Sequence, residues 1–195
     1  MKSFTKTTIL TLLIVMLSFT DYAQTPVASK AKHRKELRMK KKAEKARASL
    51  ESRKYYAYLL KNRAFVLEAT EFYGPRGVMM PVSPSTNFLA VRKNKLIFQF
   101  GLGAGGRNGV GGMTAEGFIN HYEFDPGKNN NKALSVSGSI QPKGSGVRGF
   151  FTVTVMNSGV ADLSISLPFS SGQIRMSGRI VSLPKAGVFK GQTDF

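Results

Sequence analysis

The chain has 195 residues and contains neither cysteine nor tryptophan. It carries 29 lysine and arginine residues against 11 aspartate and glutamate residues, which gives a formal net charge of +18 at pH 7. The lack of cysteine excludes disulfides and attachment through an acylated cysteine, so the core must hold by packing alone. We therefore expect a protein that is not lipid-anchored and that has one domain after its leader.

The first 23 residues have the order of a secretory signal. Lys2 and Lys6 precede an apolar run from Ile9 to Phe19, and Ala23 supplies a small residue where a signal peptidase would cut. The run is much shorter than the roughly 20 residues that cross a bilayer as a helix. We expect residues 1–23 to be a signal peptide. The mature protein would then be exported to the periplasm or the extracellular space, with no transmembrane span after cleavage.

Residues 24–48 form a basic arm. The stretch from Lys30 to Lys54 holds 12 lysine and arginine residues and three glutamates, without Gly or Pro, and is rich in helix-forming residues. We expect a helix from about Lys35 to Leu60, with Arg53 on its apolar face and residues 49–60 packed on the domain. The arm either binds polyanions such as acidic lipids or glycans, or acts as a solvated tether. The candidate polyanion contacts are Lys40, Lys41, Lys42, Lys45 and Arg47.

From Ala64 onward, apolar and polar residues alternate in short segments. The segment FFTVTVMNSGVADLSISLPF reads as a hairpin with its turn at residues 157–159, and NFLAVRKNKLIFQFG reads as another with its turn at Lys93 and Asn94. Because successive side chains of a strand point to opposite faces, each strand would have one apolar, buried face and one polar, solvent-exposed face. We predict one mainly β (α+β) domain over residues 49–195. It would be an antiparallel β-sandwich or partly open barrel of about seven to nine strands, with one N-terminal α-helix.

The stretch GLGAGG matches the dinucleotide-binding pattern G-x-G-x-x-G at Gly101, Gly103 and Gly106. That pattern needs a helix directly after the glycines and a crossover to a parallel strand. Further glycines stand where the helix would be, so we expect no nucleotide and no other cofactor. The alternative is a long connection between two strands, from about Gly101 to Gly117, that is a candidate ligand or partner loop. The residues assigned to it are Gly101, Gly103, Gly106, Arg107, Gly111 and Gly112.

Catalytic patterns are weak in this chain. Glu116, His121, Glu123 and Asp125 form a candidate polar cluster, but the sequence specifies no third metal ligand and no G-x-S-x-G nucleophile. We therefore predict no catalytic residues, no metal site and no enzymatic activity. The alternative is a hydrolase of envelope polymers that uses this cluster in a cleft.

The order of motifs resembles a family of exported domains of unknown function that is common in Bacteroidota, many of them lipid-anchored. The residues that carry the resemblance are RAFVLEA, VTVMNSGVADLSIS and MSGRI, and it covers roughly residues 45–183. It implies a mainly antiparallel β domain with an N-terminal helix in the cell envelope, and it brings no catalytic residues. This chain departs from the family by its lack of cysteine and its basic arm. We expect a non-enzymatic binding or structural module of the cell envelope whose partners are envelope polyanions or another envelope protein.

Overall fold

The computed structural model describes residues 26–74, 77–101, 112–129, 132–168 and 172–188. The predicted signal peptide, residues 1–23, lies outside them. The chain divides into two compact units, of which the first ends at Arg47 and the second begins at Ala48. Helix α2 (Pro26–Lys61) contains this boundary. The helix begins earlier than the predicted Lys35. Pro26 fits the first turn of a helix, and no further Pro or Gly occurs before the helix ends at Lys61.

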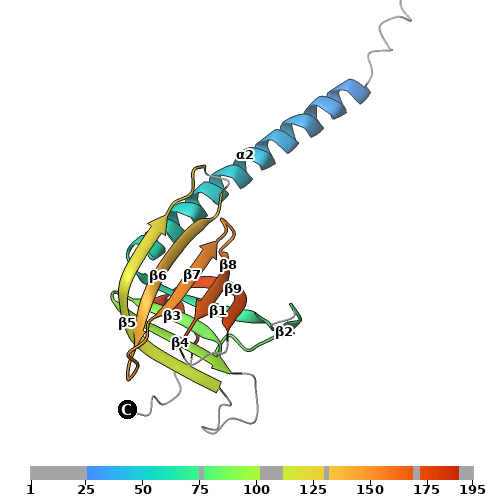
Figure 1. The fold of residues 1–195 in the computed structure, drawn as a ribbon. Coiled ribbons are helices and arrows are strands. Elements are labelled where there is room, and N and C mark those ends of the chain that lie inside the picture. Colours follow the sequence, from blue (N-terminus) through green and yellow to red (C-terminus); the bar gives the residue numbers. More distant parts are fainter. Residues whose placement is uncertain (1–25, 75–76, 102–111, 130–131, 169–171, 189–195) are drawn as a thin grey trace, which may run out of the picture. The chain divides into compact units, whose positions relative to one another are not determined.

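The second unit is an antiparallel sheet (Figure 1). Strands that follow one another in sequence from β3 to β9 are neighbours, and β1 pairs with both β3 and β9. This closes eight strands into a barrel, while β2 pairs with β1 as an extra strand. The elements are β1 (Ala64–Tyr73), β2 (Met79–Pro81), β3 (Phe88–Arg92), β4 (Lys95–Gly101), β5 (Gly112–Asp125), β6 (Leu134–Pro142), β7 (Gly149–Val155), β8 (Val160–Ser166), β9 (Gln173–Ser182) and the 3₁₀-helix η2 (Leu183–Lys185).

The predicted fold class, a mainly antiparallel β domain with one N-terminal helix, is confirmed. Of the two forms left open by the sequence, the sheet takes the barrel form rather than the sandwich, and the β1–β9 pairing closes it. Both predicted hairpin turns are present. Lys93 adopts φ 56° between β3 and β4, and Gly159 adopts φ 84° between β7 and β8.

Alternation along the strands sorts side chains to the inside and outside of the barrel. On β8, Ala161, Leu163 and Ile165 are buried, whereas Asp162 is exposed. The buried side chains of the strands and of the helix end form one continuous core cluster. An eight-stranded barrel has an interior just wide enough for side chains to fill. The outer face is therefore the first place to look for a site.

The last turns of α2 belong to the second unit and join its core. Leu59 and Leu60 are buried in the core cluster. Arg53 is only 8% exposed and donates hydrogen bonds to the backbone oxygens of Lys132 and Pro126 and to Asn157 Oδ1, the last at 3.1 Å. Among the described residues, no helix combines the length and the apolar character needed to cross a membrane.

Candidate ligand pocket on the outer face of the barrel

Two rows of polar side chains cross the outer face of the barrel from β7 to β1. Cross-strand pairing links Thr152, Ser164, Arg175 and Tyr73 in that order, one from each strand. The adjacent row runs Thr154, Asp162, Ser177 and Glu71. Neighbours within a row have Cβ atoms about 5 Å apart. Four strands thus place hydroxyl, carboxylate, guanidinium and phenol groups side by side.

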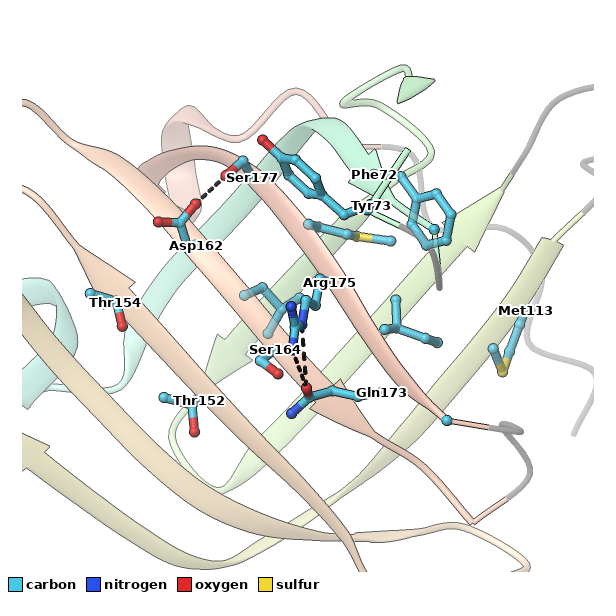
Figure 2. Close-up of a pocket in the computed structure, with 16 residues that line it drawn as sticks. Phe72, Tyr73, Met113, Thr152, Thr154, Asp162, Ser164, Gln173, Arg175 and Ser177 are labelled. Carbon is cyan, nitrogen blue, oxygen red and sulfur yellow. Dashed lines mark hydrogen bonds between the residues drawn. The ribbon is translucent and has the colours of Figure 1, made fainter. Parts of the chain in front are cut away.

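A pocket of about 930 Å³ lies over these rows. Figure 2 shows the polar side chains of β7, β8 and β9 on one side of it, and Phe72 and Met113 on the other. Its lining residues are Phe72, Tyr73, Gly74, Gly77, Met113, Thr152, Thr154, Asp162, Leu163, Ser164, Gly172, Gln173, Ile174, Arg175, Met176 and Ser177. The volume is in the range of pockets that hold small molecules.

Hydrogen bonds order several of these groups. Ser177 Oγ donates to Asp162 Oδ1, and the Nε and Nη2 of Arg175 each donate to Gln173 Oε1 at 3.3 Å (Figure 2). Tyr73 donates its hydroxyl to Glu71 Oε2 at 2.7 Å, and this bond raises the pKa of the Tyr73 phenol above 10.0 because it favours the protonated form. Arg175 is exposed. Its two hydrogen bonds go to the uncharged amide of Gln173, so they do not neutralise the positive charge of the guanidinium.

Ser164 stands between Thr152 and Arg175 in its row. Its Oγ is shielded from solvent and has no hydrogen-bond partner within the described part of the chain. A buried hydroxyl without a partner costs roughly 1–3 kcal/mol. The row therefore holds a polar atom whose hydrogen-bonding capacity is not used by the described residues.

The other side of the pocket is apolar. Phe72, Met113 and Ile174 are partly buried against the core, and the ring of Phe72 lies 4.6 Å from that of Phe100, centroid to centroid. Met113 directly follows Gly112 at the start of β5. Phe72 pairs with Met176 and directly precedes Tyr73 on β1, so it belongs to the inward-facing set, on the opposite side of the sheet from the polar rows.

The glycine loop is only partly within the described residues. Gly101 ends β4, Gly112 begins β5, and the two are paired. A side chain at Gly112 would place its Cβ 2.1 Å from the Phe100 carbonyl oxygen, so glycine is required there. The predicted connection was too long at its end, because Gly117 lies inside β5. Gly103, Gly106, Arg107 and Gly111 lie outside the described residues. The strands that flank the loop are antiparallel, whereas the dinucleotide pattern requires a parallel pair.

The predicted polar cluster lies along β5 and does not converge. The side chain of Glu116 is 11% exposed, and its Oε1 forms an ion pair with Lys143 Nζ at 3.1 Å. His121 and Glu123 are 70% and 71% exposed at a separation of 4.0 Å, and Asp125 accepts a bond from the Gly127 amide. None of the four lines the pocket. Within the described ranges, no three His, Asp or Glu side chains gather as a possible metal site.

The predicted polyanion contacts, Lys40, Lys41, Lys42, Lys45 and Arg47, lie on α2 in the first unit and are all exposed. The residues that line the pocket were not predicted as site residues. Their only signal was the Ser/Thr alternation of three consecutive segments, which by itself indicates a solvated face.

A family model described as a domain of unknown function, DUF4251, matches residues 46–180. The chain belongs to the DUF4251 family. The crystal structure of a DUF4251 family protein from Bacteroides eggerthii is similar to it, with 27% sequence identity and a TM-score of 0.58. That similarity covers 74% of this chain and 95% of the other. Comparison with curated proteins gives no match. The resemblance to a family of unknown function is thereby confirmed, and the DUF4251 match spans β1 to β8 and most of β9, including the pocket.

Proposed function

We propose that this DUF4251 protein is an exported, non-enzymatic binding module of the cell envelope that holds a saccharide in its outer-face pocket. Export is supported by the signal pattern of residues 1–23. The observation that carries the ligand assignment is the row in which the exposed Thr152 and Arg175 flank Ser164 on adjacent strands, next to the Thr154 hydroxyl.

The chemistry of the lining suits a sugar. Hydroxyl groups both donate and accept, as do those of a saccharide, and Thr152 and Thr154 offer two of them on β7. Arg175 is the lining cation and would favour a sugar that carries a carboxylate.

The same lining argues against glycoside hydrolysis. That reaction uses two carboxyl groups on either side of the scissile bond. Among the lining residues, Asp162 is the carboxylate, and it accepts a hydrogen bond from Ser177; Glu71, at the end of the same row, accepts one from Tyr73 and does not line the pocket. The hydrolase alternative therefore gains no support from the pocket or from the separated residues of β5.

Binding is tested by titration of the full exported chain with the disaccharide of N-acetylglucosamine and N-acetylmuramic acid, followed by amide NMR. We expect shifts of the Thr152, Ser164 and Arg175 amides. Arg175→Met should weaken binding about tenfold, because a charged hydrogen bond is lost. The matched control is Arg179→Met, four residues along β9 and outside the lining. If neither this disaccharide nor its uncharged analogue chitobiose shifts the pocket amides, the proposal is wrong.

A further inference from the structure

The charged residues of α2 are sorted to two sides of the helix. At about 100° per residue, Glu36, Lys40, Glu44 and Arg47 fall within roughly 80° of one another. We call these four the mixed face. On the other side, within an arc of about 120°, all the residues between 32 and 47 are bases. This basic face consists of Arg34, Lys35, Arg38, Lys41, Lys42 and Lys45. Every residue of both faces is exposed.

The two faces differ in their local electrostatics. On the mixed face, Lys40 lies four residues from Glu36 and from Glu44, and Arg47 lies three residues from Glu44. Such spacings place opposite charges next to each other on a helix surface. On the basic face most of the corresponding neighbours are also bases, for example Arg38 with Lys41 and Lys42; the exception is Glu44, three residues after Lys41. Five of the six bases of the basic face therefore have no acidic neighbour at these spacings, and like charges repel along it.

We propose that the basic face docks on an anionic lipid surface. Its six bases extend over twelve residues, a rise of about 16 Å along a straight helix, so a planar surface can reach all of them together. Each base held close to an acidic bilayer contributes roughly a factor of five in affinity. Four to six such contacts are enough for stable, salt-sensitive adsorption.

The character of the helix sets the mode of docking. Its residues 30–47 contain no Phe, Tyr or Trp and no continuous apolar stripe. Insertion into the acyl region needs such a stripe, so the contact is electrostatic and superficial. Single-stranded nucleic acids bind through stacking on aromatic side chains, and this segment has none to offer. The inference does not depend on a ligand in the barrel pocket.

The test uses the full exported chain and two variants of equal net charge. The basic-face variant carries Arg38→Gln, Lys41→Gln, Lys42→Gln and Lys45→Gln. The control variant carries Lys32→Gln, Lys40→Gln, Arg47→Gln and Lys54→Gln, all on the other side of the same helix. Co-sedimentation is measured with phosphatidylcholine vesicles with and without phosphatidylglycerol, at low and high salt, and circular dichroism checks the helix content.

The wild type should bind the phosphatidylglycerol vesicles at low salt, bind phosphatidylcholine weakly, and release at high salt. The basic-face variant should lose at least about 30-fold in affinity, and the control variant less than about threefold. Equal losses in both variants would assign binding to net charge and overturn the proposal, as would equal binding to both vesicle types or to neither. Tighter binding of a single-stranded 20-mer DNA at the same salt would also overturn it.

Discussion

Tyr122 joins the barrel wall to the end of α2. Its hydroxyl donates a hydrogen bond to the Leu60 carbonyl oxygen at 2.5 Å, and the Arg63 guanidinium lies 4.6 Å from the centre of its ring. Burial raises the pKa of the Tyr122 phenol well above its ordinary value of 10.0, although the positive charge of Arg63 acts in the opposite direction. The protonated form is thus the one that the folded state accommodates.

This shift predicts a loss of stability at high pH. The folded-state pKa lies above the unfolded value, so the contribution is fully present below about pH 10 and is lost as the pH rises beyond it. We expect the urea midpoint of the wild type to fall more steeply between pH 9 and pH 11 than that of Tyr122→Phe. The control is Tyr58→Phe, at an exposed tyrosine near the end of α2, which should keep the wild-type dependence of the urea midpoint on pH. Equal slopes in all three proteins would contradict the assignment.

Arg53 shows what a single sequence could not settle. The helix pattern places this residue on the apolar face, where an arginine looks like an interruption. In the fold it is nearly buried and donates to the backbone oxygens of Pro126 and Lys132 and to Asn157. Its acceptors come from two strand connections far along the chain. The helical period predicted that Arg53 faces the domain, but its hydrogen-bond acceptors follow only from the tertiary structure.

The β7–β8 turn is the element that receives Tyr56 of α2. Gly159 adopts φ 84°, and a Cβ at this position would lie 2.1 Å from the Tyr56 hydroxyl oxygen. The Gly159 carbonyl also accepts a hydrogen bond from the Ile180 amide at 3.0 Å, which ties the turn to β9. Two separate effects therefore oppose a side chain here, the backbone conformation and the contact with the helix.

Gly159→Ala should lower the free energy of unfolding by about 2–4 kcal/mol, since the left-handed conformation alone costs about 1–2 kcal/mol and the Tyr56 contact adds to it. Gly144→Ala is the matched control, because Gly144 has φ 71° and nothing within 4 Å of its would-be Cβ. It should cost only about 1–2 kcal/mol in urea unfolding. In a Tyr56→Ala background the two glycine substitutions should cost the same. A larger cost at Gly159 in that background would show that Tyr56 is not the cause.

At the scale of elements, the local patterns predicted much of the fold. Period-two alternation located the strands, and the sequences Lys93–Asn94 and Asn157–Ser158–Gly159 located two turns. The extra strand β2 was not recognised, because Met79–Pro81 is short, exposed and contains a proline. The start of α2 was placed too late, because repulsion among its bases was given more weight than its uninterrupted helix-forming composition.

Barrel closure belongs to the whole molecule and creates the candidate site. β1 and β9 come from the two ends of the domain, and only their pairing brings Tyr73 next to Arg175 and Glu71 next to Ser177. No local pattern in either segment specifies this contact. The polar cluster on β5 was predicted from sequence proximity, yet neighbours along a strand are spread out: Glu116 and Asp125 are separated by about 30 Å of extended chain.

The division of the chain at Ala48 predicts which part of α2 the barrel needs. Ser49, Arg53, Tyr56, Leu59 and Leu60 make the described contacts of the helix with the rest of the second unit. A chain that starts at Ala48 keeps all of them. We therefore expect its urea midpoint to equal that of a chain that starts at Gln24, as followed by far-ultraviolet circular dichroism.

A chain that starts at Arg63 should behave differently. It loses two buried leucines, each worth about 2–5 kcal/mol, together with the bonds of Arg53. That loss approaches the whole stability of an ordinary domain, so we expect this chain to lose its cooperative unfolding transition. If the Ala48 chain failed in the same way, residues before 48 would have to stabilise the barrel. If the Arg63 chain unfolded like the other two, the helix end would be dispensable, and α2 would serve only to carry its basic face.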